Sequence, residues 1–299
     1  MSLAELRRLI TRHVRPDGTT AIDGVLVSRA DAADPPSSSS SGTVLALIAQ
    51  GAKRIALGDR IYDYRAGQYL VASIDLPITG HYTEASRAVP ALGFGLTLRP
   101  ATIAALLLET AAAEPRAGVR GAPVPSGLAV SDAPAELVDA AVRMLRLLEQ
   151  PRDRPVLAPM IEREILWRLI TGPQGAAVRQ IGLADSSLTR ISRAVRWIRD
   201  HHAEAFRVDE LARLSGMSVS AFHRTFQAVT AMSPIQFQKR IRLQQARLLL
   251  VTRPEDVAGA GYAVGYDSPS QFSREYRRLF GTPPGLDAAR LRETAPAAG

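Results

Sequence analysis

A helix–turn–helix pattern occurs twice in the C-terminal part of this 299-residue chain, at residues 209–226 and 255–280. In each copy, a short helix with apolar spacing is followed by a glycine turn, a small polar cap and a second helix that carries arginine. The copies lie roughly 50 residues apart, which suits two units that stand on successive turns of one DNA duplex. The repeat therefore predicts an all-helical C-terminal domain that recognises DNA.

The positive charge of the chain is concentrated in the same region. From residue 188 onward there are 17 basic and 10 acidic side chains, and before it there are 20 and 19, so the net charge is +7 there and +1 in the preceding part. A basic domain beside a neutral one favours binding of a polyanion, although a solvated basic surface accounts for the charge equally well. Only Lys53 and Lys239 are lysines, and the remaining positive charge is arginine, which suits contacts with guanine and phosphate.

Short aliphatic segments between residues 20 and 125 predict β-strands. Plausible hairpin turns, Gly58-Asp59 and Ala66-Gly67, separate some of them. Such a series is typical of a small antiparallel barrel or sandwich. The run 35–42 (PPSSSSSG) reads as a flexible loop, either an ordinary surface loop or a cover for the mouth of the barrel. The expected strands are 24–28, 43–50, 53–57, 60–64, 68–73 and 92–98.

Two amphipathic helices are expected after the strands, at residues 134–149 and 158–170, with prolines between them. They could pair across a two-fold axis in a homodimer or simply cover the open face of the barrel. Residues 171–185 contain glycine and proline and read as a linker. We therefore expect an α+β multidomain chain with a cupin-like barrel at about 20–125 and helices at about 134–170. The predicted domains are a sensor and dimerisation domain at 1–175, a linker at 176–187 and a DNA-binding domain at 188–295.

The barrel lacks the residues that catalysis would need. Metal-dependent barrels use two or three histidines and a carboxylate, but His81 is the only histidine among the predicted strands. The chain has no cysteine and no nucleophile elbow, P-loop or dinucleotide fingerprint. We therefore expect neither an enzyme nor a bound metal or cofactor. An enzyme fused to a DNA-binding domain remains the alternative from another class.

A binding role remains for the barrel, with a small molecule or a protein partner as the controlling ligand. An open cavity lined by polar groups would favour the small molecule, and a barrel filled with side chains would favour the partner. Each polar or amphipathic residue near the strands is also compatible with a surface or structural role. The candidates for ligand contact are Arg54, Tyr62, Tyr64, Tyr69, His81 and Arg87.

Side chains on the second helix of each repeat are the candidates for base contact. Ser218 should cap the first of these helices through its hydroxyl group, leaving Val219, Phe222 and Phe226 on the buried side. Asp267 or Ser268 should cap the second, which begins at Pro269. Outward side chains in the first two turns reach base edges in a major groove, where arginine binds guanine and glutamine binds adenine. The candidates are Ser220, His223 and Arg224 in the first copy and Ser270, Gln271, Ser273, Arg274 and Arg277 in the second.

A long helix should join the repeats, because Ser233 and Pro234 supply a cap and a first-turn proline and the helical pattern continues to residue 251. It would be a rigid spacer that holds the recognition helices one DNA turn apart, about 34 Å. Lys239, Arg240 and Arg242 lie on this helix and could contact phosphates, with an ordinary charged helix face as the alternative.

At these residues the chain resembles the AraC/XylS family of bacterial transcription regulators. The stretches SPIQFQKRIRLQQARLLL and AVGYDSPSQFSREYRRLFGTPP are similar to the most characteristic signature of that family, and residues 42–80 resemble its cupin-like sensor domain. The resemblance implies a ligand-responsive regulator that binds double-stranded DNA, is usually a homodimer and often activates RNA polymerase. Its methyl-accepting DNA repair relatives need a reactive cysteine, which this chain lacks. The resemblance to the family also supports the base-contact role of Ser220, His223, Arg224, Ser270, Gln271 and Arg274.

The chain departs from this family at Gly259 and Gly261, where alanine or a larger residue is more usual. A glycine in a helix costs about 1 kcal/mol relative to alanine. Either these glycines allow close packing on the long helix, or the second unit is loosely formed and becomes ordered on DNA. In the second case, replacing both with alanine should raise DNA affinity.

No apolar stretch approaches the roughly 18 residues that a membrane span needs, and the N-terminus lacks the apolar core of a signal peptide. We therefore expect a soluble cytoplasmic protein with no membrane partner.

Overall fold

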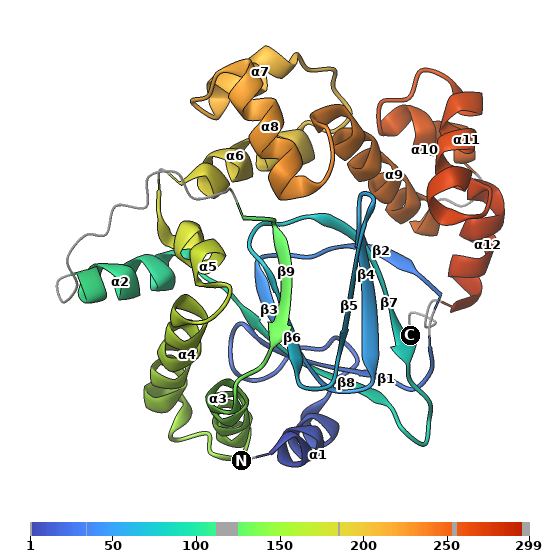
Figure 1. Ribbon diagram of the computed structural model, residues 1–299. Helices are drawn as coiled ribbons and strands as arrows, with labels where there is room; N and C mark the ends of the chain where they lie inside the picture. The colour runs from blue at the N-terminus through green and yellow to red at the C-terminus, as the bar shows by residue number, and fades with distance from the viewer. Residues whose placement is uncertain (1, 34, 112–124, 185, 253–255, 295–299) are drawn as a thin grey trace. The chain divides into compact units, whose positions relative to one another are not determined.

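The computed structural model describes residues 2–33, 35–111, 125–184, 186–252 and 256–294 (Figure 1). Part of the expected barrel (112–124), Asp185 and the expected start of the second repeat at Glu255 lie outside these ranges. The chain divides into two units. One consists of Met1–Ser192 with Arg224–Ala231, and the other consists of Arg193–His223 with Met232–Gly299.

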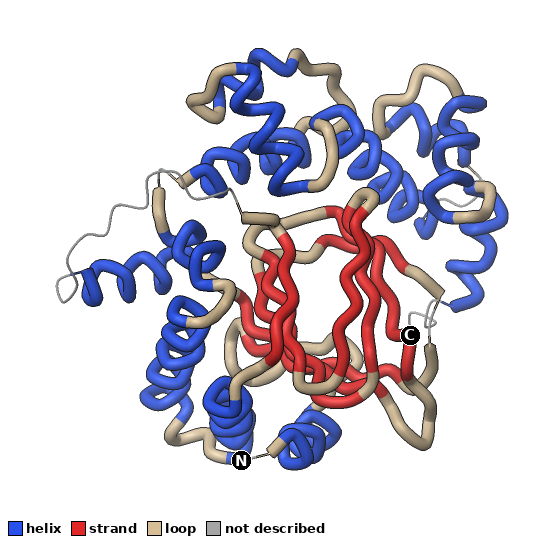
Figure 2. The backbone as a smooth tube through the Cα atoms, viewed as in Figure 1, coloured by secondary structure: helices blue, strands red, loops and turns tan. Residues whose placement is uncertain are grey.

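The strands of the first unit form two antiparallel sheets that face each other (Figure 2). Sheet A has the strand order β1-β8-β3-β6-β9, and sheet B has the order β2-β7-β4-β5. The antiparallel β architecture expected from the sequence is thus confirmed. The strands are β1 (Val25–Ala30), β2 (Ser37–Ser40), β3 (Val44–Gln50), β4 (Ala52–Leu57), β5 (Arg60–Arg65), β6 (Gln68–Ala72), β7 (Pro77–Glu84), β8 (Ala91–Thr97) and β9 (Leu128–Asp132).

All six predicted strands are present, but β2, β7, β9 and one helix were not predicted. The serine run expected to be a loop contains β2, which pairs with β7 from Ser37 opposite Gly80 to Ser40 opposite Pro77. Strand β7 itself begins with proline and contains glycine, which obscures it in the sequence. Residues Pro100–Ala111 form helix α2 within the segment assigned to strands.

Helices cover the outer face of sheet A. Helix α1 packs on β1, β3 and β8, and α3 packs on both α1 and α4. Their apolar sides meet the outward residues of the sheet, including Val27 and its β8 partner Phe94, which are 1% and 2% exposed. The helices are α1 (Leu3–His13), α3 (Ala135–Arg146), a short 3-10 turn η1 (Leu147–Glu149), α4 (Arg154–Thr171) and α5 (Gly175–Gly182).

Two boundaries differ from the expectation. Helix α4 begins a turn earlier than predicted, because Pro155 lies in the first turn, where its missing N–H is not needed, and the helix continues past Pro159. The predicted linker at 176–187 contains helix α5, which packs on α2 and α4 and buries Ala177, Val178 and Ile181. Glycine at both ends of this segment concealed a helix whose apolar spacing is regular.

The C-terminal part of the chain is helical. A buried cluster that includes Leu243, Ala246, Phe272 and Tyr276 fills the space between α9 and the second helix–turn–helix. No helix in the described ranges is long and apolar enough to cross a membrane. The helices are α6 (Ser187–Asp200), α7 (Val208–Leu214), α8 (Val219–Thr230), α9 (Pro234–Thr252), α10 (Val257–Ala263), α11 (Pro269–Phe280) and α12 (Pro284–Thr294).

Candidate nucleic-acid and small-molecule sites

Helix α8 exposes the three side chains expected to contact bases. The Ser218 hydroxyl accepts a hydrogen bond from the backbone N–H of Ala221 at 3.3 Å, which confirms the predicted cap. On the helix that follows, Ser220, His223 and Arg224 are exposed. Val219, expected on the buried side, is 45% exposed because it lies at the very start of α8. Gln227 is exposed one turn further along the same face and was not among the candidates, although its i+7 spacing from Ser220 marks it.

Helix α11 has the same construction. The Ser268 hydroxyl accepts from the backbone N–H of Gln271 at 3.3 Å, and Pro269 occupies the first turn, as predicted. Phe272 and Tyr276 are fully buried and fix the rotation of the helix. The opposite face carries the exposed candidates Ser270, Arg274 and Arg277, together with Arg278, which sequence reasoning missed.

Gln271 and Ser273 are less accessible than the other candidates on α11, since both are part-buried. The Gln271 amide donates to Glu275 Oε1 at 3.1 Å, and the same carboxylate accepts from Lys239 Nζ at 2.9 Å and from the Tyr266 hydroxyl at 2.8 Å. Burial of Glu275 opposes its ionisation, but these three hydrogen bonds outweigh it and lower the pKa of the carboxyl. A surface hollow of about 430 Å³, lined by Gln271, Arg274, Glu275 and Arg278, opens here.

The arginines of α9 lie differently from the expected phosphate contacts. Arg242 donates hydrogen bonds to the carbonyl oxygens of His202, Ala203, Glu204 and Gly265, at 2.6–3.2 Å. A guanidinium engaged in this way has little left to offer a phosphate. Arg240 is part-buried, and burial lowers its pKa. Helix α9, predicted as a spacer, therefore also holds neighbouring backbone segments together through Arg242.

Arg242 joins the segment after α6 to the turn of the second helix–turn–helix. In that turn, Gly265 has a φ of +87°, which favours glycine, and a Cβ there would lie 2.2 Å from the carbonyl oxygen of Ala203. Gln238, one turn earlier on α9, donates to the carbonyls of His202 and Glu204 at 3.0 and 2.6 Å. The second unit thus holds its two parts together by side chains that reach backbone carbonyls.

The two unusual glycines of α10 allow close packing. A Cβ on Gly261 would lie 3.0–3.4 Å from atoms of the Phe272 side chain, and one on Gly259 would lie 2.0 Å from Oδ2 of Asp256, whose carboxylate caps the helix. These contacts favour close packing over a loosely formed unit, but the partners are Phe272 on α11 and the Asp256 cap rather than the long helix expected from the sequence. Replacement of both glycines is therefore expected to damage the second unit.

The faces of sheets A and B that meet are only partly filled. On the inner face of sheet A, Leu26 is 38% exposed, and Ser28, Ala46 and Gly95 are part-exposed, whereas Ile48 and Leu70 on the same face are each 2% exposed. The outward neighbours in the same strands are buried, as Val25 at 2% exposure illustrates. Accessible small residues on a face that points into a domain indicate room between the sheets, which favours a small molecule over a filled barrel.

Tyr62 and Tyr64 on β5 are the two ligand candidates whose side chains face this interior. Tyr64 pairs directly with Lys53 on β4, and Lys53 pairs with Tyr82 on β7, so these three side chains share one face. The Tyr82 hydroxyl lies 2.8 Å from Ser28 Oγ on the opposing sheet. Lys53, Tyr82 and Ser28 were not predicted, because their orientation depends on strand register.

The other four candidates lie elsewhere. Arg54 faces outward, where it forms a bidentate ion pair with Asp63 at 2.6 and 2.9 Å, and His81 is its partner on β7. Tyr69 is buried on the outer face of sheet A, where its hydroxyl bonds to Ser131. Arg87 is exposed after the end of β7. Because side chains alternate along a strand, Arg54, His81 and Tyr69 face away from the interior.

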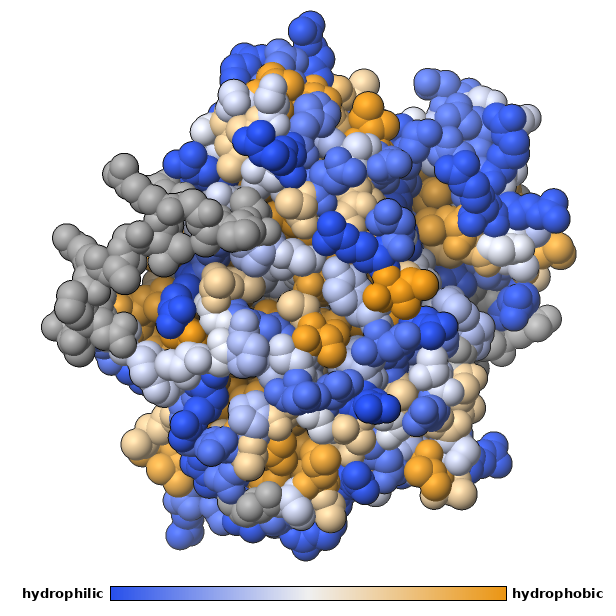
Figure 3. Space-filling view, in the orientation of Figure 1, coloured by the Kyte–Doolittle hydropathy of each residue, from blue (hydrophilic) through white to orange (hydrophobic). Residues whose placement is uncertain are grey.

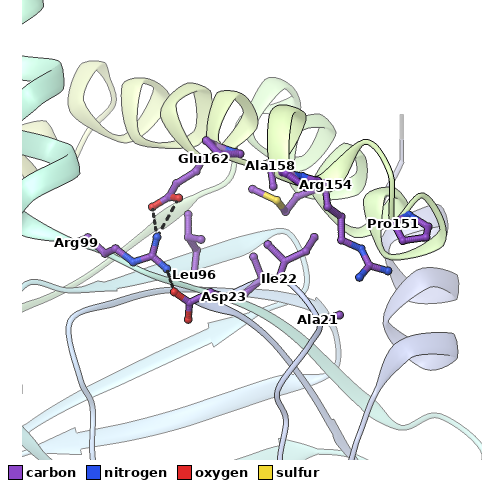
Figure 4. Close-up of a pocket in the computed structure, with 13 residues that line it drawn as sticks. Ala21, Ile22, Asp23, Leu96, Arg99, Pro151, Arg154, Ala158 and Glu162 are labelled. Carbon is purple, nitrogen blue, oxygen red and sulfur yellow. Dashed lines mark hydrogen bonds and ion pairs between the residues drawn. The ribbon is translucent and has the colours of Figure 1, made fainter.

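A second hollow of about 420 Å³ lies between α4 and the outer face of sheet A. Figure 4 shows Arg99 extending between Asp23 and Glu162, with Nη2 2.8 Å from Asp23 Oδ2 and Nη1 3.3 Å from Glu162 Oε2. Burial raises the pKa of Glu162, while Arg99 acts in the opposite direction. The remaining wall is largely apolar, so the site could hold an apolar group, but its central cation is already neutralised.

Two protein-family models match the chain. One, described as the AraC-type transcriptional regulator N-terminus, matches residues 21–177, and the other, a helix-turn-helix domain, matches residues 211–288. The first match alone covers more than half of the chain and contains both sheets. The second contains α8, α9, α10 and α11, with all the base-contact candidates.

Among curated proteins, the chain is 28% identical over 145 residues to the HTH-type transcriptional activator RhaS of Escherichia fergusonii, covering 48% of this chain and 51% of that protein. It is 26% identical over 162 residues to the HTH-type transcriptional regulator ExsA of Pseudomonas aeruginosa, covering 54% and 57%. The chain thus spans about half the length of the curated relatives it matches.

Among solved structures, the fold is similar to that of ToxT from Vibrio cholerae. An apo form aligns with a TM-score of 0.53 and 10% identity over 91% of this chain and 100% of that one. A form described as bound to an unsaturated fatty acid aligns with a TM-score of 0.52 and 11% identity over 92% and 98%. At such low identity the likeness concerns the fold alone.

Proposed function

This chain belongs to the family of AraC-type transcriptional regulators, and from this premise we propose that it regulates transcription by binding double-stranded DNA through α8 and α11. The observation that carries the proposal is the exposed polar face that each helix presents directly after a serine cap. A helix with this construction can enter a major groove with its first turns against the base edges.

Base contacts are assigned to the exposed side chains of these helices. Arg224 and Arg274 can each bind guanine O6 and N7 bidentately, and His223 can donate one hydrogen bond. Gln271 is a weaker candidate, since its amide already donates to Glu275. Ser220, Ser270 and Arg277 complete the exposed contacts, and Ser273, which is part-buried, is a weaker candidate like Gln271. Arg242 is left out because its guanidinium already donates to four backbone carbonyls, and Arg240 because burial lowers its pKa.

We propose that a small molecule bound between the two sheets controls this activity. The accessible inner faces support this, as does the description of a ToxT structure as bound to an unsaturated fatty acid. The alternative is control by a protein partner, which would need no accessible interior. An enzymatic role has no support in the residues that line the site.

We further propose that the protein is a homodimer joined through α4. Val156 and Met160, one turn apart on this helix, are 64% and 61% exposed. On the face shown in Figure 3, hydrophobic surface occurs as separate patches among hydrophilic residues. Val156 and Met160 have the spacing of one helical turn, which suits pairing with a second copy of the same helix.

Capture of fragmented genomic DNA by the purified chain, followed by sequencing, tests the regulatory proposal. Enrichment of sites with two short conserved blocks about 10 bp apart is expected, because each protomer would occupy two successive major grooves. A homodimer would give paired sites, each with its own two conserved blocks. If the folded chain enriches no sequence with or without its effector, the proposal is wrong. The neighbouring genes, and the position of the sites relative to promoters, would show whether RNA polymerase is contacted.

A further inference from the structure

The ammonium group of Lys53 faces the interior between the sheets without a counter-ion. Across the described part of the chain no carboxylate pairs with it, and burial is the only influence on its pKa, which it lowers. Nζ instead lies over the ring of Tyr82, 5.1 Å from its centroid. A cation held in this way is incompletely compensated.

The neighbouring position on the same strand shows the contrast. Arg54 points to the opposite face, where Asp63 neutralises it through two hydrogen bonds. Arg99, in the hollow beside α4, lies between Asp23 and Glu162. Of these three cations near accessible surfaces of the first unit, only Lys53 has a charge left for a ligand.

The groups around Lys53 define what could accompany an anion there. The rings of Tyr64 and Tyr82 flank it on the neighbouring strands, and the Ser28–Tyr82 hydroxyl pair lies across from them on sheet A. Glycine at position 93 leaves room for this hydroxyl pair, since a Cβ there would lie 2.6 Å from Ser28 Oγ and 3.4 Å from the Tyr82 hydroxyl oxygen. Tyr64 is 2% exposed, so the accessible site combines one cation, two hydroxyl groups and the ring of Tyr82.

From this arrangement we propose that the effector is an organic anion, whose carboxylate or equivalent group pairs with Lys53 while its apolar body lies against the ring of Tyr82. The inference rests on the proposed binding of an effector between the sheets and adds its chemical class. A neutral polyol would leave the ammonium without a counter-ion, and a cationic ligand would be repelled by it. A charge-assisted hydrogen bond from Nζ satisfies both partners.

The scarcity of lysine makes a direct test practicable. In full-length protein labelled with ¹³C-lysine, only Lys53 and Lys239 give side-chain signals, and Lys239 serves as an internal reference because it is paired with Glu275. The probes are formate, which is too small to be excluded by shape, and benzoate, with benzyl alcohol and benzylamine as neutral and cationic matches. Formate and benzoate should shift the Lys53 signal saturably and raise its pKa, leaving Lys239 unchanged.

Variants locate the binding. Lys53→Met should weaken benzoate binding about tenfold or more, as expected for the loss of a hydrogen bond between charged groups. Arg54→Met, on the outer face of the same strand, should bind benzoate as the wild type does. Circular dichroism of each variant establishes that it is folded.

Three outcomes would overturn the inference. If neither anion moves the Lys53 signal, or if Lys53→Met binds benzoate normally, the anion site is not at Lys53. If benzyl alcohol perturbs the Tyr64 and Tyr82 signals and benzoate does not, the interior binds neutral molecules, and the proposed function stands without the anion. If no probe perturbs any of these signals while sequence-specific DNA binding is intact, the proposal that a small molecule between the sheets controls the protein is overturned as well.

Discussion

Arg242 on α9 donates from Nη1 to the carbonyl oxygen of Gly265 at 2.7 Å. The same guanidinium also reaches the carbonyls of residues 202–204, so one side chain binds both parts of the second unit. The distance and angle between the two recognition helices would depend on these hydrogen bonds, because each helix must enter its own major groove in register.

Arg242→Ala should therefore loosen the DNA-binding domain. Loss of hydrogen bonds from a charged donor, with the carbonyls left behind, is expected to lower the free energy of unfolding by about 1.5–3 kcal/mol. Urea denaturation measures this change, and DNA affinity should fall for all sequences alike. Arg213→Ala, which removes an exposed arginine on α7, is the matched control and should change stability by less than about 0.5 kcal/mol. If both substitutions lowered the free energy of unfolding equally, Arg242 would not hold the two parts of the domain together.

The turn glycine of the second helix–turn–helix should tolerate no side chain. Gly265→Ala combines a positive φ with a Cβ 2.2 Å from the Ala203 carbonyl oxygen, so it should cost more than the roughly 1 kcal/mol of backbone strain alone. Gly281→Ala is the control, because Gly281 has a similar φ of +78° and a Cβ there would meet nothing within 4 Å beyond its chain neighbours. Thermal unfolding should show the larger loss for Gly265→Ala. Similar losses would mean that contact with Ala203 does not matter.

Replacing Gly259 and Gly261 together with alanine should weaken DNA binding. The added methyl groups would press on Asp256 and on the Phe272 ring, which holds α11 in place. Electrophoretic mobility shift with an enriched genomic site measures the change. Tighter binding by the double variant would restore the idea that the second unit becomes ordered only on DNA.

Arg224→Ala should reduce affinity for the cognate site by about 1–3 kcal/mol and relax the preference at one base position. This loss follows from removal of a bidentate guanine contact in the major groove. Binding to a library randomised at each position of the site measures both quantities. A uniform loss on every sequence, with the base preference retained, would make Arg224 a phosphate contact instead.

Lys53→Met should stabilise the ligand-free protein at neutral pH. Because folding lowers the pKa of Lys53 from its ordinary 10.5, the unfolded chain binds more protons between the two pKa values, and stability should rise with pH through that window. Below it the full cost of the buried charge remains, so the variant should gain roughly 1–3 kcal/mol. Urea denaturation of both proteins at several pH values measures the difference, which should shrink as the pH rises. Lys239→Met, which removes a paired lysine, should bring no such gain.

Met160→Lys should convert the proposed homodimer to a monomer, because a charge would enter an apolar helix pairing. Ile61→Lys is the matched control, since Ile61 on β5 is 63% exposed and Met160 is 61% exposed. Sedimentation velocity distinguishes monomer from dimer. A wild-type monomer, or a dimer that survives Met160→Lys, would rule out pairing through this part of α4.

The sequence by itself determined the secondary structure wherever a local rule applied. Ser218 and Ser233 cap their helices as predicted, and Ser268 caps α11 as one of the two residues expected there, because a hydroxyl at that position satisfies nearby backbone N–H groups without help from the rest of the fold. The spacing of Phe222 and Phe226 likewise fixed which side of α8 is exposed. These are interactions between residues within a few positions of one another.

Only the tertiary structure decided which polar residues face the interior and which arginines are available. Period-2 alternation separates Arg54 from Lys53, but strand pairing was needed to set Lys53 beside Tyr82 and away from Asp63. The sequence predicts a phosphate contact for Arg242, but in the fold its guanidinium donates to the carbonyls of residues 202–204 and Gly265. Both outcomes depend on residues distant in sequence, whose approach is set by packing of the whole domain and leaves no local pattern.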